Sequence, residues 1–248
     1  MTSNERRAAL VTGAAAGIGR AITERLLADG WDVLAVDLRP EGPGVQHTAD
    51  LTTREGNLGS VQAALHRFGR LDAVVANAGF QHVAPVADFP EDTWDALLAL
   101  MLTSPFLLAK HAWSALVAAP QGGRFLAVAS AHALVASPYK AGYVAAKHGV
   151  LGLVKTLALE GAAHGLSATA LCPGYVRTAL VERQIAHQAV AHGLTEEQVL
   201  DQVLLAPQAV KRLLEPEEVA DAAAFLLGPS GRAFTGVAVP MDNGWTAR

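Results

Sequence analysis

Three polar side chains in the middle of the chain have the types and spacing needed for acid–base chemistry at an oxygen atom. Tyr143 and Lys147 stand four positions apart, and Ser130 precedes the tyrosine by 13 residues. Positions four apart share one face of a helix, so both side chains should point into one site. An ammonium beside a phenol favours the phenolate and lowers the phenol pKa from its usual value of about 10. Such a tyrosine exchanges protons near neutral pH while a serine hydroxyl holds the substrate oxygen, which suits carbonyl/alcohol interconversion.

A glycine-rich turn near the N-terminus predicts a nucleotide site. The apolar run Ala8–Val11 leads into Thr12-Gly13-Ala-Ala-Ala-Gly17-Ile18-Gly19, after which apolar residues recur at helical spacing. This pattern is typical of a strand, a tight turn and a helix. Glycines let the backbone approach a pyrophosphate, and the helix N-terminus offers free N–H groups to its oxygens. Any tight turn can use glycine, so this turn alone does not establish a nucleotide site. A lone Tyr-x-x-x-Lys pair can likewise lie on a solvated helix face, so the two motifs indicate an enzyme site only when they occur together.

Asp37, which ends the second predicted strand, favours NAD over NADP. A carboxylate at a strand tip accepts hydrogen bonds from the adenosine ribose hydroxyls and repels a 2′-phosphate. The glycine loop contains no basic residue, which also favours NAD. Arg39 argues in the opposite direction, because an arginine at this position could bind the 2′-phosphate of NADP. A turn residue or a helix cap is the alternative role for Asp37.

Composition excludes several classes of protein. The chain has 248 residues, 51% of them hydrophobic and 17% charged, with a net charge of −4. We expect no nucleic-acid partner because there is no basic run, and no membrane span because no apolar stretch approaches the required ~20 residues. The N-terminus does not resemble a signal peptide. Cys172 is the only cysteine, which excludes an intrachain disulfide and fits a cytoplasmic location, and no histidine cluster predicts a metal site.

Alternating strands and helices predict a Rossmann-type doubly wound parallel sheet of about seven strands, with helices on both faces, in one domain over residues 1–248. Pro105 should distort the third helix. The amphipathic segment 178–208 is either a flexible cover over the site or a solvated helix pair. The predicted strands are Ala8–Val11, Val33–Asp37, Ala73–Asn77, Arg124–Ser130, Ser167–Cys172 and Val237–Val239. The predicted helices are Ile18–Ala28, Leu58–Phe68, Asp92–Val117, Tyr139–Ala163 and Glu217–Leu227.

In this order, the motifs resemble those of the classical short-chain dehydrogenase/reductase family over essentially the whole chain. The resemblance implies an NAD-binding domain in which Ser130, Tyr143 and Lys147 are catalytic and the last two also contact the cofactor. The motifs that carry the resemblance are Thr12-Gly13-x-x-x-Gly17-Ile18-Gly19, Asp50-Leu51, Asn77-Ala78-Gly79 and Pro173-Gly174-x-Val176-x-Thr178. The resemblance implies that Asp50 and Leu51 meet the adenine and that Val176 and Thr178 position the nicotinamide. The other cofactor residues that it implies are Thr12, Gly13, Gly17, Ile18, Gly19, Asn77, Gly79 and Pro173.

Several phrases resemble more narrowly the bacterial D-3-hydroxybutyrate dehydrogenases of that family. They are Gly79–Pro85, Ser130–Ala136, Tyr143–Gly149, Arg177–Gln184 and Gly244–Arg248. The likeness implies a homotetramer acting on a small 3-hydroxy acid. It implies that the substrate carboxylate is bound by Gln81, His132, Lys140 and Gln184, with Trp245 packed near it. The residue types agree, because an ammonium supplies charge while amides and imidazole supply directional donors. Taken singly, each of these residues could instead be solvated.

Met101 departs from the family's pattern, which has an asparagine at this position. The resemblance implies that the asparagine helps to hold a water connecting Lys147 to solvent. A thioether is a weak acceptor and donates nothing, so Met101 cannot take that role. Three interpretations remain open: a relay through other groups such as Thr103, Ser104 or added water, a slow enzyme, or a ligand-binding descendant without catalysis. The intact trio favours the first two, and another substrate, such as a 3-oxoacyl thioester or a cyclic alcohol, also remains open.

Overall fold

A seven-stranded parallel sheet forms the centre of the computed structural model, which describes residues 6–182, 185, 189 and 193–247. The strand order is β3-β2-β1-β4-β5-β6-β7, so it reverses between β1 and β4, where a crevice opens at the carboxyl ends of the strands. This confirms the predicted fold class. The strands are β1 (Ala8–Thr12), β2 (Asp32–Asp37), β3 (Val45–Thr48), β4 (Ala73–Ala76), β5 (Arg124–Val128), β6 (Ser167–Pro173) and β7 (Ala238–Met241).

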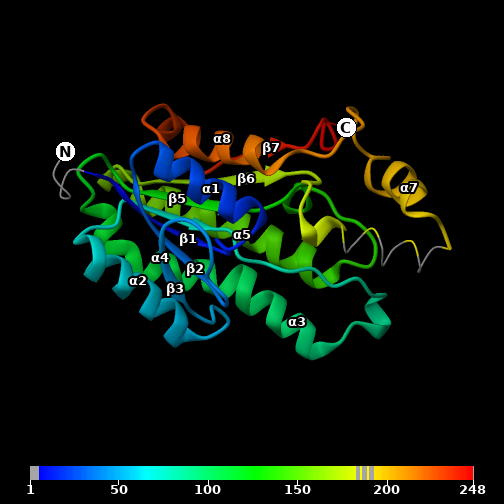
Figure 1. Ribbon diagram of the computed structural model, residues 1–248, viewed down its shortest axis with the longest axis horizontal. Coiled ribbons are helices and arrows are strands. Elements are labelled where there is room, and N and C mark those ends of the chain that lie inside the picture. The colour runs from blue at the N-terminus through cyan, green and yellow to red at the C-terminus, as the bar shows by residue number, and fades with distance from the viewer. Residues whose placement is uncertain (1–5, 183–184, 186–188, 190–192, 248) are drawn as a thin grey trace.

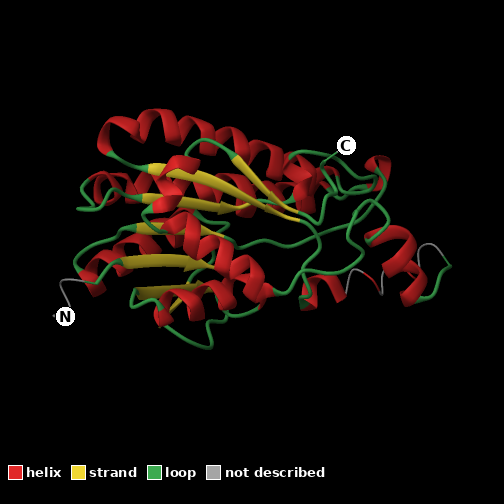
Figure 2. Ribbon diagram, turned by 90° about the horizontal axis from the view of Figure 1, so that it is seen from above, coloured by secondary structure: helices red, strands yellow, loops and turns green. Residues whose placement is uncertain are grey.

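Helices cover both faces of this sheet (Figures 1 and 2). On one face, α1 (Gly17–Ala28) packs against α8 (Pro216–Leu227). On the other lie α2 (Arg54–Phe68), α4 (Ser104–Val117) and α5 (Ala141–Gly161), whose buried side chains form a second hydrophobic core with the sheet. Because both faces are covered, β1, β4, β5 and β6 are buried along their whole length, as parallel strands between helical layers usually are.

The strand missing from the sequence prediction is β3, at the edge of the sheet. Its sequence is Val-Gln-His-Thr, and its residues alternate between half-buried and exposed. It pairs with β2 in the register Leu34↔Val45. An edge strand buries one face weakly, so its sequence lacks the continuous apolar run that identifies the central strands.

The third predicted helix is interrupted where Pro105 was expected to distort it. It consists of α3 (Glu91–Leu98), a π-helical turn η2 (Ala99–Thr103) and α4. Proline has no N–H to donate one turn back, so the regular hydrogen-bond ladder cannot pass through Pro105. Single π-turns inside helices are often found at functional sites, and this one carries Met101.

The span Glu91–Val117 is 27 residues long and apolar enough to cross a membrane by length and composition. The sequence prediction that no stretch approaches such a length was therefore wrong as a statement about composition. In the structure this span is a core helix, because α4 packs between α2, α5 and the sheet.

Short segments complete the described part of the chain. They are the 3₁₀ turns η1 (Val86–Asp88), η3 (Ala131–Ala133), η4 (Ala162–His164) and η6 (Ser230–Phe234), the helix α7 (Glu196–Val199) and the π-turn η5 (Leu200–Leu204). Figure 1 shows α7 beyond the carboxyl end of the sheet. The predicted flexibility of segment 178–208 stays a prediction, because part of that segment lies outside the described residues.

Candidate active site

Ser130, Tyr143 and Lys147 meet beyond the carboxyl end of β5, as their spacing predicted. Tyr143 and Lys147 lie on the first turns of α5, and Ser130 precedes η3, where its hydroxyl accepts a hydrogen bond from the His132 N–H at 3.1 Å. Ser130 also lies next to the Tyr143 phenol and acts to lower its pKa. Lys147 Nζ lies 5.5 Å from the centre of the Tyr143 ring and donates to the Val128 carbonyl oxygen at 2.8 Å.

The pKa of Tyr143 moves in the opposite direction to the sequence prediction. Burial raises the pKa of Tyr143, while the hydrogen bond from Ser130 opposes this shift. Burial also lowers the pKa of Lys147 to about 8. Desolvation of the phenolate is the largest of the effects on the Tyr143 pKa. The Lys147 ammonium donates one N–H to the Val128 carbonyl oxygen and keeps its other N–H groups for further contacts.

A long cleft runs along the crevice between β1 and β4 and has the size and lining of a nucleotide site. It consists of two cavities of about 480 and 370 Å³ that share Gly13, Asp37 and Gly79 in their walls. A Cβ on Gly13, whose φ is +64°, would lie 2.9 Å from Ala78 Cα, so only glycine leaves the backbone free to face a ligand. The other predicted cofactor residues that line the cleft are Gly17, Ile18, Asp50, Leu51, Asn77, Tyr143, Lys147 and Thr178.

Asp37 stands at the tip of β2, where the two cavities of the cleft adjoin. Its carboxylate accepts hydrogen bonds from the backbone N–H groups of Ala15 at 3.1 Å and Arg39 at 3.4 Å. The carboxylate is thereby fixed beside the glycine loop with accepting capacity to spare, as recognition of ribose hydroxyls requires. The Arg39 contact is made by its backbone, and the residue is exposed.

Four predicted cofactor residues do not line either cavity: Thr12, Gly19, Pro173 and Val176. The Thr12 hydroxyl accepts from the N–H groups of Asn77 at 2.9 Å and Ala78 at 3.0 Å and so holds the loop after β4. A Cβ on Gly19 would collide with the Gly13 carbonyl oxygen. These residues shape the walls of the cleft, and their direct contact with a cofactor stays a prediction.

A smaller cavity of about 60 Å³ opens beside Ser130 and Tyr143. It shares Tyr143 and Leu180 with the larger cleft cavity, so the phenol faces both spaces. The structure brings four of the five predicted substrate residues to it, and Gln184 lies outside the described residues. Those that line it are Gln81, His132, Lys140 and Trp245, together with Gly174, Tyr175, Leu180 and Val181.

Lys140 is the one residue with a formal charge among those lining this small cavity. It is only 3% exposed, and Nζ donates to the Tyr175 hydroxyl at 3.2 Å. Burial lowers the pKa of Lys140 to about 8. Tyr175 in turn stacks on Trp245, with ring centres 5.4 Å apart and planes 12° from parallel. The sequence prediction missed Tyr175, because it falls at an unspecified position of the Pro173-Gly174-x-Val176 motif.

His132 is buried, and both of its ring nitrogens already face serine hydroxyls. Nδ1 lies 3.4 Å from Ser130 Oγ and Nε2 lies 2.9 Å from Ser137 Oγ. Burial and the charge of Lys140 lower the pKa of His132 to about 3, so its imidazole is neutral. The predicted role of His132 in a carboxylate clamp therefore requires one of these contacts to be exchanged. Gln81 Oε1, by contrast, is buried without a hydrogen-bond partner.

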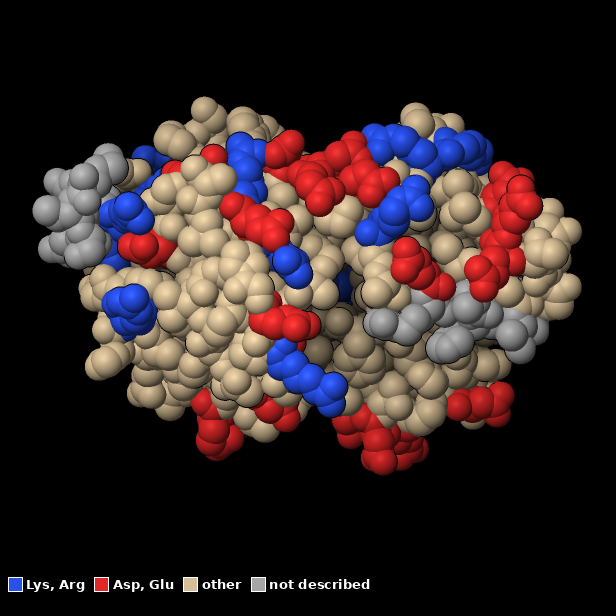
Figure 3. All heavy atoms as spheres, in the orientation of Figure 1, with Lys and Arg blue, Asp and Glu red and all other residues tan. Residues whose placement is uncertain are grey.

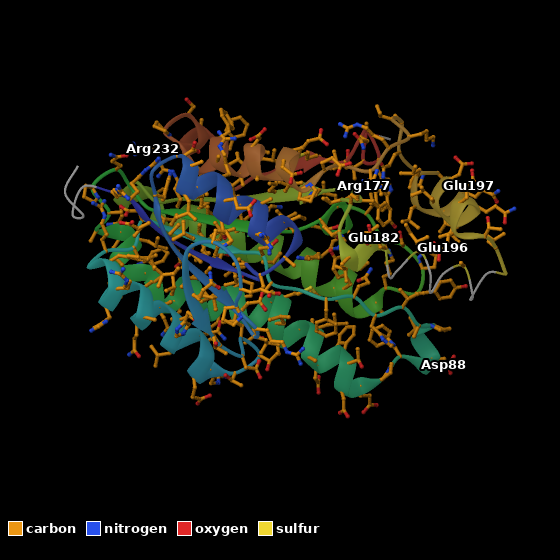
Figure 4. All side chains as sticks on the ribbon, viewed as in Figure 1. Asp88, Arg177, Glu182, Glu196, Glu197 and Arg232 are labelled. Carbon is orange, nitrogen blue, oxygen red and sulfur yellow. The ribbon has the colours of Figure 1, made fainter. Side chains whose placement is uncertain are left out.

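Figure 4 shows the charged side chains at the end of the molecule where the strands finish. Asp88, Glu196 and Glu197 lie there on exposed segments, whereas Arg232 lies at the opposite end. Arg177 also lies at this end, where it pairs with Glu215 at 3.0 Å, so charges of both signs are present on the surface there. Lys140 is the charged residue inside the small cavity.

Met101 packs an apolar side chain where the family has an amide. It is 2% exposed, clusters with Leu97 and Ala146, and approaches Gly79 so closely that a Cβ there would lie 2.9 Å from its sulfur. Thr103 and Ser104, the suggested substitutes, line none of the three cavities described above. Ser104 instead donates to Asn57 Oδ1 at 2.7 Å. A relay through these two residues is therefore not supported.

Other classes of site find no support in the part of the chain that is described. It contains no group of histidine, cysteine, aspartate and glutamate residues that could hold a metal ion. Figure 3 shows basic side chains interspersed with acidic ones on the face it presents, which differs from a nucleic-acid-binding surface.

Comparison with known proteins gives consistent matches over the whole chain. Residues 13–246 match a short-chain dehydrogenase family model described as enoyl-(acyl carrier protein) reductase. The chain is 41% identical to the uncharacterized oxidoreductase YxjF of Bacillus subtilis, covering 98% of this chain and 99% of that protein. It is 40% identical to the D-beta-hydroxybutyrate dehydrogenase of Rhizobium meliloti, with the same coverage. Among solved structures, the ligand-free aldohexose dehydrogenase of Thermoplasma acidophilum matches with a TM-score of 0.90 and 25% identity, covering 100% of this chain and 96% of that one.

Proposed function

Because the chain belongs to the short-chain dehydrogenase/reductase family, whose members are oxidoreductases that use NAD or NADP, we propose that it interconverts D-3-hydroxybutyrate and acetoacetate with NAD. The observation that carries this proposal is the buried Lys140 in a small cavity that opens onto Tyr143. A cavity of about 60 Å³ suits a short acid, and an ammonium at its wall can pair with the carboxylate.

The chain's own residues can perform the proton half of this reaction. When bound, the nicotinamide cofactor supplies the acceptor for the hydride that leaves the carbinol carbon. Ser130 hydrogen-bonds the reacting oxygen, and Tyr143 takes the hydroxyl proton. Lys147 stabilises the phenolate and is placed to hold the cofactor ribose at the wall of the cleft. Lys140 and Gln81 would hold the carboxylate, while Trp245 and Tyr175 exclude water from the small cavity.

The direct test mixes the protein with NAD and D-3-hydroxybutyrate and follows the absorbance of the reduced cofactor. We expect turnover with this acid and none with the L-enantiomer. Activity confined to a 3-oxoacyl thioester or a cyclic alcohol would support the second candidate, a dehydrogenase of the same family with a neutral substrate. That candidate is favoured by the relatives named as polyketide synthase ketoacyl reductases and as (−)-trans-carveol dehydrogenase, which are 30–33% identical. Binding of NAD without turnover of any of these alcohols would favour the non-catalytic descendant.

Asp37 should decide between NAD and NADP. In the Asp37→Ser variant we expect the ratio of kcat/KM for NADP to that for NAD to rise by about 10- to 100-fold, because repulsion of the 2′-phosphate and the ribose hydrogen bonds are both lost. Steady-state kinetics with both cofactors measure this ratio. A wild-type enzyme that already prefers NADP would contradict the NAD proposal and point to Arg39 as the phosphate ligand.

Lys140 should give the affinity for the acid a characteristic pH dependence. Its pKa is lowered to about 8, so the ammonium is present below pH 8 and is lost above it. The KM for 3-hydroxybutyrate should therefore rise about tenfold between pH 7 and 9. The control is a neutral secondary alcohol, whose KM should stay level; changes common to both substrates, such as titration of Lys147, cancel in the ratio. A KM for the acid that is independent of pH over this range would contradict the pairing.

We also propose a cytoplasmic homotetramer. Large apolar side chains stand exposed on α4 and α5, including Phe106 at 47% and Leu159 at 82% exposure, and such residues are common at the interfaces of oligomers. Light scattering coupled to size-exclusion chromatography measures the mass. A monomer at micromolar concentration would contradict this assignment.

A further inference from the structure

A chain of neighbouring polar side chains leads from the Tyr143 phenol away from the cofactor cleft. The phenol lies next to Ser130, which acts to lower the phenol pKa, and both residues line the small cavity. Ser130 Oγ lies 3.4 Å from His132 Nδ1, a long hydrogen bond, and His132 Nε2 lies 2.9 Å from Ser137 Oγ. Ser137 is half-buried and stands between the exposed residues Ala136 and Pro138. The path thus runs from the reacting group to the surface through three polar side chains, joined by two hydrogen bonds.

On the other side of the trio, Lys147 lines the large cleft, and no chain of hydrogen-bonded side chains leads from it to the surface among the described residues. Lys147 Nζ is bound to the Val128 carbonyl oxygen, and the buried Met101 thioether stands where an amide would hold a water. Thr103 and Ser104 lie outside the cavities of the site. Oxidation of an alcohol nevertheless leaves one proton on Tyr143 in every turnover, and this proton has to reach solvent.

We propose that this proton leaves through Ser130, His132 and Ser137. Tyr143 passes its proton to Ser130 Oγ while Ser130 passes its own to His132 Nδ1. The Nε2 proton of His132 moves to Ser137 Oγ, and Ser137 releases its proton to water. One O–H or N–H bond forms for each that breaks, Tyr143 returns to the phenolate, and the imidazole changes tautomer without gaining charge. After the product leaves, water in the small cavity takes the Nδ1 proton while Nε2 regains a proton from solvent through Ser137, which restores the starting tautomer for the next turnover. Reduction of the carbonyl runs the same steps in reverse. The inference rests on the alcohol chemistry of the proposed function but not on the identity of the acid.

The surroundings of His132 favour a neutral shuttle over an imidazolium intermediate. Burial and the charges of Lys140 and His148 oppose protonation of the ring. The ring edges also meet Tyr143 and Trp245, with centres 5.8 and 5.0 Å away, which fixes the orientation of both nitrogens. A histidine held between two hydroxyls can accept a proton at one nitrogen as it gives one up at the other. This role accounts for two hydrogen bonds that a carboxylate clamp would leave unused.

Ser137→Ala tests the outer step because Ser137 lines none of the cavities described above and should not touch the substrate. Stopped-flow measurement with a pH indicator follows proton release, while absorbance follows cofactor reduction, on whichever alcohol supports turnover. In the wild type we expect the two signals to coincide. In Ser137→Ala we expect cofactor reduction in the first turnover to keep its rate, while proton release lags at least fivefold and kcat falls accordingly. Ser114→Ala, an exposed serine on α4, is the matched control. Proton release that keeps pace with cofactor reduction in Ser137→Ala would overturn the proposal.

A substitution of Met101 provides a second test of the proposed relay. An asparagine at this position is shorter than methionine and can hold a water, so Met101→Asn should open the other route to solvent. In the Ser137→Ala background, Met101→Asn should raise the rate of proton release at least threefold. If the Ser137→Ala defect came from a distorted site, a change on the Met101 side of Tyr143 would not repair it, and that outcome would also count against the relay.

The tautomer of His132 can be read without cofactor or substrate. Nitrogen NMR of the histidine-labelled protein should show His132 neutral, with its proton on Nε2, from pH 5 to 9. Removal of Ser137 should shift the Nε2 resonance and leave His132 neutral. A resting imidazolium, or a proton fixed on Nδ1, would block acceptance from Ser130 and overturn the proposal even if 3-hydroxybutyrate proved to be the wrong substrate.

Discussion

Replacing Tyr143 with phenylalanine should lower kcat by about 10³- to 10⁴-fold, because the substrate hydroxyl then has no proton acceptor in reach. General acid–base catalysis by one positioned group contributes about 10²–10⁴ in rate, and Tyr143 is the phenol that faces both the cofactor cleft and the small cavity. The ring of phenylalanine keeps the packing against Met101 and the edge contact with His132. Binding of NAD, measured by titration calorimetry, should change by less than about threefold.

Tyr139→Phe is the matched control for this substitution. Tyr139 lies four residues upstream, is 48% exposed and lines none of the cavities described above, so the same loss of a hydroxyl should leave kcat within a factor of two. Retention of more than a tenth of wild-type kcat in Tyr143→Phe would show that another group takes the proton.

The burial of Tyr143 and Lys147 also determines how kcat depends on pH. Because desolvation raises the pKa of Tyr143 in the ligand-free protein, its phenolate forms at neutral pH only if positive charge is brought near it. Lys147 supplies part of this charge, and its own pKa of about 8 limits the range over which it can do so. The sequence motif predicted the attraction between Lys147 and the Tyr143 phenolate. It did not predict the opposing desolvation of Tyr143, because the extent of burial depends on segments distant in the chain.

The central strands and the glycine turn could be predicted because each is encoded locally. A buried parallel strand is apolar along its whole length, and a turn that faces a phosphate needs glycine at fixed positions. Asp37 was predictable for the same reason, as it directly follows β2. By contrast, β3 carries a weak apolar signal and depends on pairing with β2, so nothing local marks it.

Side-chain partners were the part of the site that the sequence could not predict. The motifs brought His132 and Lys140 to the correct cavity, but not the serines bonded to His132 or the hydroxyl of Tyr175 bonded to Lys140. Those pairs join residues whose spacing follows no helical or strand period, such as Lys140 and Tyr175, 35 positions apart. The suggested relay through Thr103 and Ser104 is not supported, because closeness to Met101 in the sequence does not determine where a side chain points. Ser104 directly follows the π-turn, and its hydroxyl donates to Asn57.

Replacing Lys140 with methionine should lower kcat/KM for 3-hydroxybutyrate about 100-fold, mostly through KM. Losing one partner of a buried charge-assisted contact costs about 2–5 kcal/mol, and 2.7 kcal/mol corresponds to about 100-fold in affinity. For a neutral secondary alcohol of similar size, the same variant should keep kcat/KM within about threefold. The melting temperature should not fall by more than a few degrees, because methionine fills the space of the aliphatic stem and removes a desolvated charge.

The control for Lys140→Met is Lys155→Met, which removes an exposed lysine from α5, the helix that begins directly after Lys140, and should alter neither substrate's kinetics. Comparing the two substrates distinguishes a role of Lys140 in binding the carboxylate from a role in holding the wall of the small cavity. If Lys140 acts on the carboxylate, the penalty falls on the acid alone. If Lys140 serves mainly to hold Tyr175 against Trp245, the variant slows both substrates equally, and the neutral-substrate candidate then becomes the better account of the small cavity. A third result, full activity toward the acid, would point to other donors in the wall of the small cavity, such as the side-chain N–H groups of Gln81, as the carboxylate contacts.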